Sequence, residues 1–339
     1  MEDAKTRSEP TSPSSGGLPV TGPQLFVDPE EQLTTRAAWL YFVAGLTQAQ
    51  IGKQLGLNRT RVNRLLAQAR DQGLVQINIT GKLANCVVLE DQLRRRFGLD
   101  EATVVPTPPD QALIPQVIAT AAGAALTARL KEGMSVGVGW GRTLRLSLQS
   151  VPRRSLTHLS VVSLLGGLTR GSAMNPHETA SHLADLFDAQ CYYIAAPALT
   201  DTETTRDILI AQPMLREVFE RGAKVDLAFI SVGELTRTCT MARVGLISMT
   251  EVSDLQKAGA VGDICAHWID AEGQLVDHPL NSRVVALSPY KLRDIPCVVI
   301  ASGGLNKASV LRGALKGDMC NVLITDEQTA IAILAEESI

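Results

Sequence analysis

Hydrophobic positions recur at helical spacing in three short segments near the N-terminus. Gly45 ends the first predicted helix, and Thr47 opens the second, with Gln50 three residues later as in a capping box. Gly56 permits a tight turn, and Asn58 caps the third helix. The inward-facing residues of this third helix are Val62, Leu65, Leu66 and Ala69. The pattern predicts three helices packed on one another, followed by a strand over residues 74–80.

Beyond Lys82 a helix is predicted to link this region to a chain of alternating strands and helices. The predicted strands cover residues 102–106, 135–139, 159–165, 191–196, 225–232, 297–301 and 321–325. The predicted helices between them include residues 114–130, 178–187, 212–221 and 307–315. Continuously apolar strands such as Cys-Val-Val-Ile-Ala indicate a mainly parallel sheet covered on both faces. Short polar turns such as Ala-Glu-Gly-Gln at 271–274 suggest a hairpin inserted between Ala260 and Ser288. The expected fold class is α/β, with an N-terminal helical domain.

Composition separates these regions further. Residues 1–29 are rich in Ser, Thr, Pro and Gly and are predicted to form a flexible tail. We therefore expect a tail over 1–29, a helical domain over 30–81 and an α/β domain over 82–339. Since no basic segment precedes an apolar run and no apolar stretch of about 18 residues is evident, we expect a cytoplasmic protein with no membrane partner.

The spacing of the cysteines and the distribution of charge narrow the possible kinds of site. The six cysteines lie far apart, without the spacing of a zinc site, so we expect buried reduced thiols and no metal or other cofactor. The formal net charge of the chain is −3, which gives no overall preference for nucleic acid. Between residues 31 and 71, however, there are six basic residues and two acidic ones, which gives this segment a net charge of +4.

Residues 47–70 have the features of a helix-turn-helix: two short helices, a glycine turn between them and a polar face on the second. Arginine can bind guanine and asparagine can bind adenine through paired hydrogen bonds, and residues at helix starts often hold phosphates. We expect Arg61 and Arg64, one turn apart, to lie exposed on the recognition helix. The candidate DNA-binding residues are Gln48, Asn58, Arg59, Thr60, Arg61, Asn63 and Arg64. The alternative is a small helical module whose basic face binds protein.

Three glycine-containing turns follow predicted strands in the α/β region, around Gly139 and Gly141, at Gly166-Gly167 and at Gly303-Gly304. Glycine lets the backbone approach a ligand, and ligands of open α/β sheets bind beyond the carboxyl ends of the strands. The polar candidates near these turns are Arg142, Thr143, Arg170, Asn175, His177, Gln212, Asp263 and Lys307. The alternative is that the glycines serve only packing and turns, and that His177 only caps a helix.

The first of these turns is neither a dinucleotide nor a P-loop motif. Its glycines fall at 137, 139 and 141, and the next predicted strand ends without an acidic residue for a ribose. Val136 stands where a P-loop needs glycine, and Arg142 stands in place of its lysine.

Several motifs in order resemble the SorC family of bacterial sugar-responsive regulators. They are Tyr-Phe-Val-Ala-Gly-Leu-Thr-Gln at 41–48, the loop at 137–143, Ala-Val-Gly-Asp-Ile at 260–264, Ala-Ser-Gly-Gly at 301–304 with Lys307, and Leu-Ile-Thr-Asp-Glu at 323–327. Residues 39–45, 163–170 and 175–177 are similar to the branch typified by erythritol regulators.

The resemblance implies an effector domain similar to sugar-phosphate isomerases, tetramers built as dimers of dimers, and operator binding altered by a sugar, a polyol or their phosphates. By position it places around the effector Gly139, Gly141, Arg142, Thr143, Gly166, Gly167, Asp263 and Lys307. Members that sense phosphates often have an arginine just before the Gly-Gly turn, where this chain has Leu165. That departure favours a neutral polyol or sugar.

The expected function is therefore a transcriptional regulator whose partners are operator DNA, a small carbohydrate or polyol effector, and other copies of the chain. One alternative is a sugar-phosphate isomerase or deaminase fused to a DNA-binding module, which needs a positioned acid and base. Asp263 and His177 are possible groups, but no compact Asp/His/Glu constellation is evident in the sequence. A second alternative is a protein-interaction module that senses no ligand.

Overall fold

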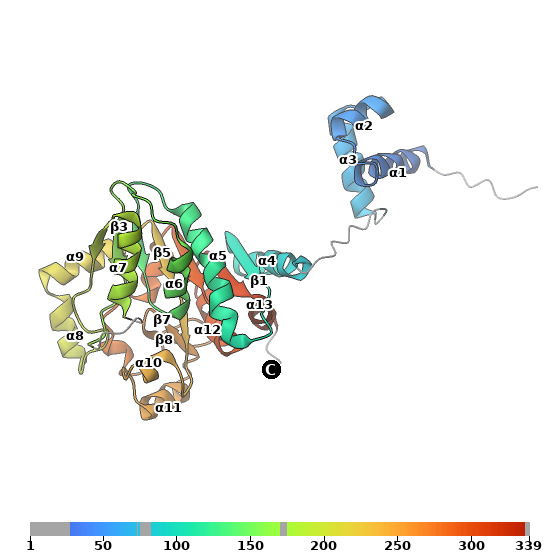
Figure 1. Ribbon diagram of the computed structural model, residues 1–339. Helices are drawn as coiled ribbons and strands as arrows, with labels where there is room; N and C mark the ends of the chain where they lie inside the picture. The colour runs from blue at the N-terminus through green and yellow to red at the C-terminus, as the bar shows by residue number, and fades with distance from the viewer. Residues whose placement is uncertain (1–27, 73, 75–82, 170–174, 336–339) are drawn as a thin grey trace, which may run out of the picture. The chain divides into compact units, whose positions relative to one another are not determined.

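The computed structural model describes residues 28–72, 74, 83–169 and 175–335 (Figure 1). Nearly all of the predicted tail, most of the predicted strand over 74–80 and Arg170 lie outside the described residues. Packing divides the chain into two units, Met1–Ile79 and Thr80–Ile339.

The first unit consists of α1 (Pro29–Phe42), α2 (Gln48–Leu55) and α3 (Arg59–Asp71). Thr47 and Gln50 form the predicted capping box at the start of α2, and Gly56 ends that helix with φ 69°. Gly52 brings α2 close to the turn, because a Cβ there would lie 2.5 Å from the carbonyl oxygen of Leu57. The core contains the predicted apolar residues Ala37, Leu40, Ile51, Val62, Leu65 and Leu66. The expected three-helix arrangement is therefore confirmed.

The second unit is built on a sheet of seven parallel strands in the order β1-β10-β9-β5-β2-β3-β4. Their bounds are β1 (Glu101–Val105), β2 (Ser135–Val138), β3 (Ser160–Ser163), β4 (Gln190–Tyr192), β5 (Leu227–Ile230), β9 (Cys297–Ala301) and β10 (Val322–Asp326). All seven predicted strands occur; β9 has the predicted bounds, and the ends of the other six are shifted. The chain leaves β2 toward β3 and leaves β5 toward β9, so the strand order reverses between β2 and β5. Such a switch point opens a crevice at the carboxyl ends of the strands.

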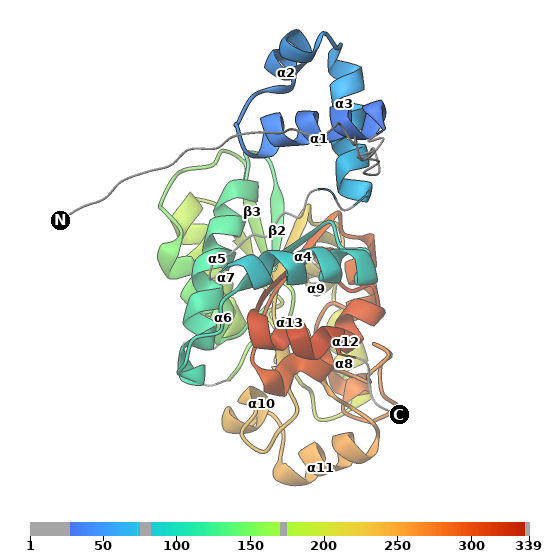
Figure 2. The same ribbon diagram turned by 90° about the vertical axis from the view of Figure 1, so that its right-hand side faces the viewer.

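Helices cover both faces of this sheet (Figures 1 and 2). One face packs against α5 (Ile114–Arg129), α6 (Arg142–Ser147) and α7 (Pro176–Phe187). The other packs against α4 (Ala84–Phe97), α12 (Ala308–Lys316) and α13 (Glu327–Leu334). Each face of the sheet therefore has its own hydrophobic core. Neighbouring residues of β5 show this: Phe229 packs in the core on the α5–α7 face, and Ile230 packs in the core on the other face.

A smaller antiparallel sheet lies beyond β5 and consists of β6 (Val232–Glu234), β7 (Gly262–Ile264) and β8 (His267–Ile269). The prediction ran β5 and β6 together as one strand over 225–232. The polar turn predicted at 271–274 closes only an isolated antiparallel bridge between Ile269 and Leu275. The hairpin that lies between Ala260 and Ser288 consists instead of β7 and β8. Its turn is Cys265-Ala266, and both residues have positive φ, at 49° and 63°.

Five of the described helices of the second unit were given no predicted bounds: α6, α8 (Glu203–Ile210), α10 (Thr240–Arg243), α11 (Met249–Lys257) and α13. All are short, so each offers few apolar positions from which a period can be read. The predicted helix over 212–221 is present as α9 (Pro213–Gly222).

The segment Gln111–Arg129, which contains α5, is a described helix long and apolar enough to cross a membrane. This differs from the expectation that no such stretch exists, because Gln and Thr residues interrupt the apolar run without lowering its mean hydropathy enough. Ile118, Ala122 and Leu126 of α5 are buried against the sheet, as in a core helix.

Candidate functional site

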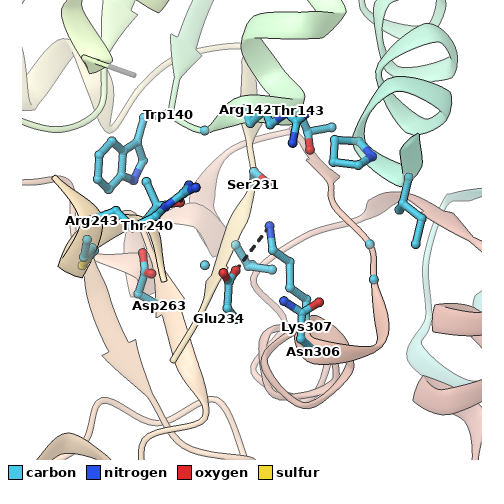
Figure 3. Close-up of a pocket in the computed structure, with 18 of the residues that line it drawn as sticks. Trp140, Arg142, Thr143, Ser231, Glu234, Thr240, Arg243, Asp263, Asn306 and Lys307 are labelled. Carbon is cyan, nitrogen blue, oxygen red and sulfur yellow. Dashed lines mark hydrogen bonds and ion pairs between the residues drawn. The ribbon is translucent and has the colours of Figure 1, made fainter. Parts of the chain in front are cut away.

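A cavity of about 270 Å³ lies at the carboxyl ends of three neighbouring strands, β2, β5 and β9. Figure 3 shows its side chains converging from the loops after these strands and from β7 and α10. The lining residues are Gln111, Ala112, Ile114, Pro115, Trp140, Gly141, Arg142, Thr143, Ser231, Val232, Gly233, Glu234, Thr240, Met241, Arg243, Asp263, Gly303, Gly304, Asn306 and Lys307. The cavity lies at the switch point of the sheet.

Seven of the predicted effector residues lie in this cavity. They are Gly141, Arg142, Thr143, Asp263, Gly303, Gly304 and Lys307. Gly141 has φ 132° and directly precedes α6, so a residue with a side chain would be strained there.

The buried carboxylate of Asp326 stabilises the turn at Gly303-Gly304. Its Oδ2 accepts a hydrogen bond of 2.9 Å from the backbone N–H of Gly304, which has φ 99°. A Cβ on Gly303 would lie 2.4 Å from the same Oδ2. This glycine pair therefore allows the loop to fold over a buried acid, beside the cavity.

Three ionisable side chains face one another in the cavity: Asp263, Glu234 and Lys307 (Figure 3). Lys307 Nζ lies 3.8 Å from Glu234 Oε2. Burial raises the pKa of Asp263 to about 7, while Lys307 lowers it and Glu234 raises it. Burial also lowers the pKa of Lys307, against the attraction of both carboxylates. The cavity thus combines strong hydrogen-bond acceptors with a donor, a combination suited to hydroxyl groups.

Gly233 is needed for the position of Asp263. The two residues are opposite one another in the β6–β7 ladder, and a Cβ on Gly233 would lie 2.1 Å from Asp263 Oδ1. The carboxylate therefore occupies the space that any larger residue at 233 would take.

We expect Gly233→Ala to weaken binding of any ligand held by Asp263, because the carboxylate must move. The overpacking should also destabilise the unit by about 1–3 kcal/mol, measured by chemical denaturation. Gly222→Ala is the control, since a Cβ there would make only ordinary contact, at 3.4 Å from Leu164 Cδ2. The loss of stability caused by Gly233→Ala should disappear when Asp263 is also replaced by Ala. A loss that persists in the double variant would contradict a clash between position 233 and the Asp263 carboxylate.

The pKa of Asp263 also predicts a pH dependence. Between about pH 4 and about pH 7 the folded protein retains a proton that the unfolded chain has released, so Asp263 stabilises less as the pH rises. His267 acts oppositely in this window, because burial lowers its pKa to about 4. The comparison with Asp263→Asn isolates the carboxyl. The free energy of unfolding of the parent, relative to that variant, should fall from about pH 5 to about pH 8. A constant difference would show that Asp263 does not titrate in this range.

Six predicted effector residues lie outside the cavity: Gly139, Gly166, Gly167, Asn175, His177 and Gln212. At the first three, the missing side chain permits close packing, against Ile230, the Ala196–Pro197 backbone and the His177 ring respectively. Asn175 caps α7, and Gln212 is the N-cap residue of α9.

His177 faces the backbone rather than the cavity. Its Nε2 lies 3.1 Å from the carbonyl oxygen of Ile194, and burial lowers its pKa. The turn at Gly166-Gly167 follows β3, the strand beyond β2 in the sheet, which explains why it does not reach the site.

Several lining residues were not predicted, among them Ser231, Glu234, Thr240, Arg243 and Asn306. Ser231 directly follows β5, so the rule that identified the other two loops applies to it as well. Glu234 is the last residue of β6, the short strand that comes next. Asn306 stands next to Lys307. Thr240 and Arg243 come from α10, which no period in the sequence indicates.

The first unit presents a polar face along α3. Arg59, Thr60, Asn63 and Arg64 are exposed, opposite the buried Val62, Leu65, Leu66 and Ala69. Asn58 caps the helix as predicted, its Oδ1 accepting from the N–H of Arg61 at 2.8 Å. Arg59 Nε donates to Gln48 Oε1 at 3.2 Å, which joins the starts of α2 and α3. Six of the predicted DNA-binding residues thus surround one end and one face of α3.

Arg61 differs from the expectation that it is fully exposed. Its guanidinium pairs with Glu30 of α1 at 2.5 Å, and its side chain is 30% exposed. Position 61 lies between the buried and exposed faces of α3, where an arginine can reach α1. The pair leaves Arg64 as the freer arginine of the two.

Among the described residues no cluster of three or more His, Cys, Asp or Glu side chains has the geometry of a metal site. The six cysteines are free thiols.

Known proteins are similar to this chain over both units. The family model described as "Putative sugar-binding domain" matches residues 81–335, and the sigma-70 region 4 model matches residues 39–72. The erythritol catabolism regulatory protein EryD of Brucella abortus is 33% identical over 311 residues, 91% of this chain and 98% of that protein. The deoxyribonucleoside regulator of Bacillus subtilis is 31% identical over 308 residues, 90% and 98% of the two chains. The crystal structure of the full-length sorbitol operon regulator SorC of Klebsiella pneumoniae matches with a TM-score of 0.69 and 28% identity, covering 90% of this chain and 99% of that one.

Proposed function

Because this chain belongs to the SorC family of sugar-binding transcriptional regulators, we propose that its cavity binds a neutral polyol or sugar that changes its affinity for an operator. The chain is a DNA-binding regulator rather than an enzyme, as are the relatives that match it over nearly their whole length. EryD is named for erythritol catabolism, and SorC for the sorbitol operon. A polyol is therefore the first class of effector to test.

The observation that carries this proposal is the group of Asp263, Glu234 and Lys307 in the cavity. Two carboxyl groups can accept hydrogen bonds from hydroxyls, and a carboxyl that is ionised disfavours a phosphate beside it. Leu165 stands where phosphate-sensing members often carry arginine. The volume of about 270 Å³ is near the lower end of ligand pockets, about 300–1,000 Å³, and suits a small molecule. Arg142 and Arg243 also line the cavity and are the groups that a phosphorylated effector would use.

A thermal-shift screen of four- to six-carbon polyols, sugars and their phosphates tests the class of effector. A ligand at about 100 times its dissociation constant stabilises the folded state by about 2.7 kcal/mol, enough for a clear rise in Tm. We expect a neutral polyol or sugar to raise the Tm of the parent and not that of Asp263→Ala. A shift given by phosphates alone would contradict the neutral effector.

For DNA, we propose that α3 lies in the major groove. Arg59, Asn63 and Arg64 would contact base edges, and Gln48, Asn58 and Thr60 would bind phosphates near the helix starts. Arg61 would act through its ion pair with Glu30, which fixes α3 against α1.

We further propose the domain division 1–29, 30–81 and 82–339, a cytoplasmic location, and a homotetramer held together by the α/β domain. A single helix-turn-helix makes too few contacts for selective binding, so two half-sites and two copies are needed.

Residues 82–339 alone are expected to associate in sedimentation velocity at micromolar concentration, since the α/β domain carries the proposed interface. The full-length chain serves as the reference. A fragment that sediments as a folded monomer would contradict this assignment of the interface.

A further inference from the structure

A second cavity, of about 400 Å³, lies among α8, α9 and the segment 284–291. Its apolar residues include Ile210, Phe219 and Leu287. Three basic residues and one acidic residue also line it: Arg206, Arg216 and Lys291, with Glu220. The cavity therefore joins an apolar wall to an excess of positive charge.

His267 places a hydrogen-bond acceptor in this cavity. The residue is 7% exposed, and its Nδ1 lies 3.0 Å from the carbonyl oxygen of Cys265. Because a carbonyl can only accept, Nδ1 carries the proton and Nε2 of the neutral ring has a free lone pair. Burial, together with the charge of Arg206, lowers the pKa of His267 to about 4, so the ring is neutral at physiological pH. Within the described residues Nε2 has no hydrogen-bond partner.

The two cavities lie on opposite faces of the small sheet. Asp263 pairs with Trp268 across the β7–β8 ladder, and Ile264 pairs with His267. Neighbouring residues of a strand point to opposite faces, so Asp263 and His267 do as well. The second cavity is thus separate from the one proposed for the polyol.

The basic residues at this cavity differ in how far their charge is already compensated. Arg206 is paired with Glu203 and Asp207, and Lys291 with Asp294. Arg216 donates to the carbonyl oxygen of Ala211 at 3.1 Å, and no described carboxylate lies within ion-pair distance of it. Arg216 is therefore available to an anion, while His267 Nε2 is available to a donor.

We propose that this cavity binds a small organic anion with an apolar body and a hydroxyl donor, of the class of aromatic or branched 2-hydroxy acids. The carboxylate pairs with Arg216, the apolar body contacts Phe219 and Leu287, and the hydroxyl donates to His267 Nε2. Such a ligand is chemically different from a neutral polyol, so the chain has a second, independent input.

Isothermal titration calorimetry of the full chain with 3-phenyllactate tests the proposal. We expect saturable binding, and binding weaker by about tenfold for 3-phenylpropionate, which lacks the hydroxyl and leaves the acceptor unpaired. Arg216→Glu should weaken 3-phenyllactate binding by at least about tenfold, since the attraction becomes repulsion. Lys224→Glu makes the same change of charge at an exposed residue outside the cavity, and should bind like the parent.

Lys307→Ala should also bind 3-phenyllactate like the parent, because Lys307 lies in the other cavity. Loss of binding in that variant would put the probe in the first cavity and overturn the proposal. The proposal is also overturned if the parent binds neither acid at millimolar concentration. It is equally overturned if the parent binds the two acids with the same affinity, or if Arg216→Glu binds 3-phenyllactate as tightly as the parent does. A further outcome is that the parent binds neither acid and that Arg216→Glu sediments differently from the parent. This face would then be a contact between copies of the chain, and the proposal would be wrong.

Discussion

Lys307→Ala is expected to abolish the influence of the effector on operator binding while leaving operator affinity without effector nearly unchanged. Lys307 lies in the cavity with its Nζ 3.8 Å from Glu234, and it belongs to a different unit from the recognition helix. An effector can shift DNA binding only through its different affinities for the two states of the protein, typically by about 5- to 150-fold. Without Lys307 that ratio should fall to about one. Asp263→Ala should have the same result, for loss of the acceptor.

Titration of operator DNA with and without effector, at fixed salt, measures this ratio for each variant. Lys257→Ala is the matched control, because Lys257 is exposed at the end of α11 and does not line the cavity. It should respond like the parent. If Lys307→Ala and Asp263→Ala also respond like the parent, the effector binds elsewhere.

Arg64→Ala is expected to weaken operator binding by about 1–3 kcal/mol, about 5- to 150-fold, and to relax the base preference at one position of each half-site. Arg64 is exposed on α3 and no partner in the described part of the unit holds it. The effector should still raise the Tm of this variant, since its cavity is intact.

Two further variants show whether the effect is specific. Arg36→Ala removes the same charge from an exposed position on α1 and should cost less, without loss of base preference. Arg61→Ala should lower the stability of the first unit as well as DNA affinity, because it breaks the pair with Glu30. Equal operator affinity for the parent and Arg64→Ala at fixed salt would contradict this placement of α3.

The elements that are defined by local pattern could be predicted from the sequence. Residues 297–301 are continuously apolar and form β9 with the predicted bounds, because a strand buried on both faces needs no alternation. Thr47 and Gln50 lie three residues apart and identify their helix start directly. The family resemblance, carried by several motifs in order, is confirmed by matches over both units.

The site could be predicted only in part, because its geometry depends on pairings between distant segments. Gly233 and Asp263 are 30 positions apart, and their contact arises from the β6–β7 ladder. Gly166-Gly167 and Gly303-Gly304 look equivalent as sequences. The first packs beside the Ala196–Pro197 backbone and the His177 ring, and only the second lines the cavity. The pair of Arg61 with Glu30 likewise joins two helices, which periodicity within one helix cannot reveal.

We expect one effector and one operator to bind the same chain and to change each other's affinity. Thermodynamic linkage makes this effect reciprocal: the factor by which effector changes operator affinity must equal the factor by which operator changes effector affinity. Measuring both factors on the full-length parent with the polyol or sugar from the thermal screen is the most direct test. We expect two equal factors that differ from one. Two factors of one, with both ligands bound, would contradict this expectation.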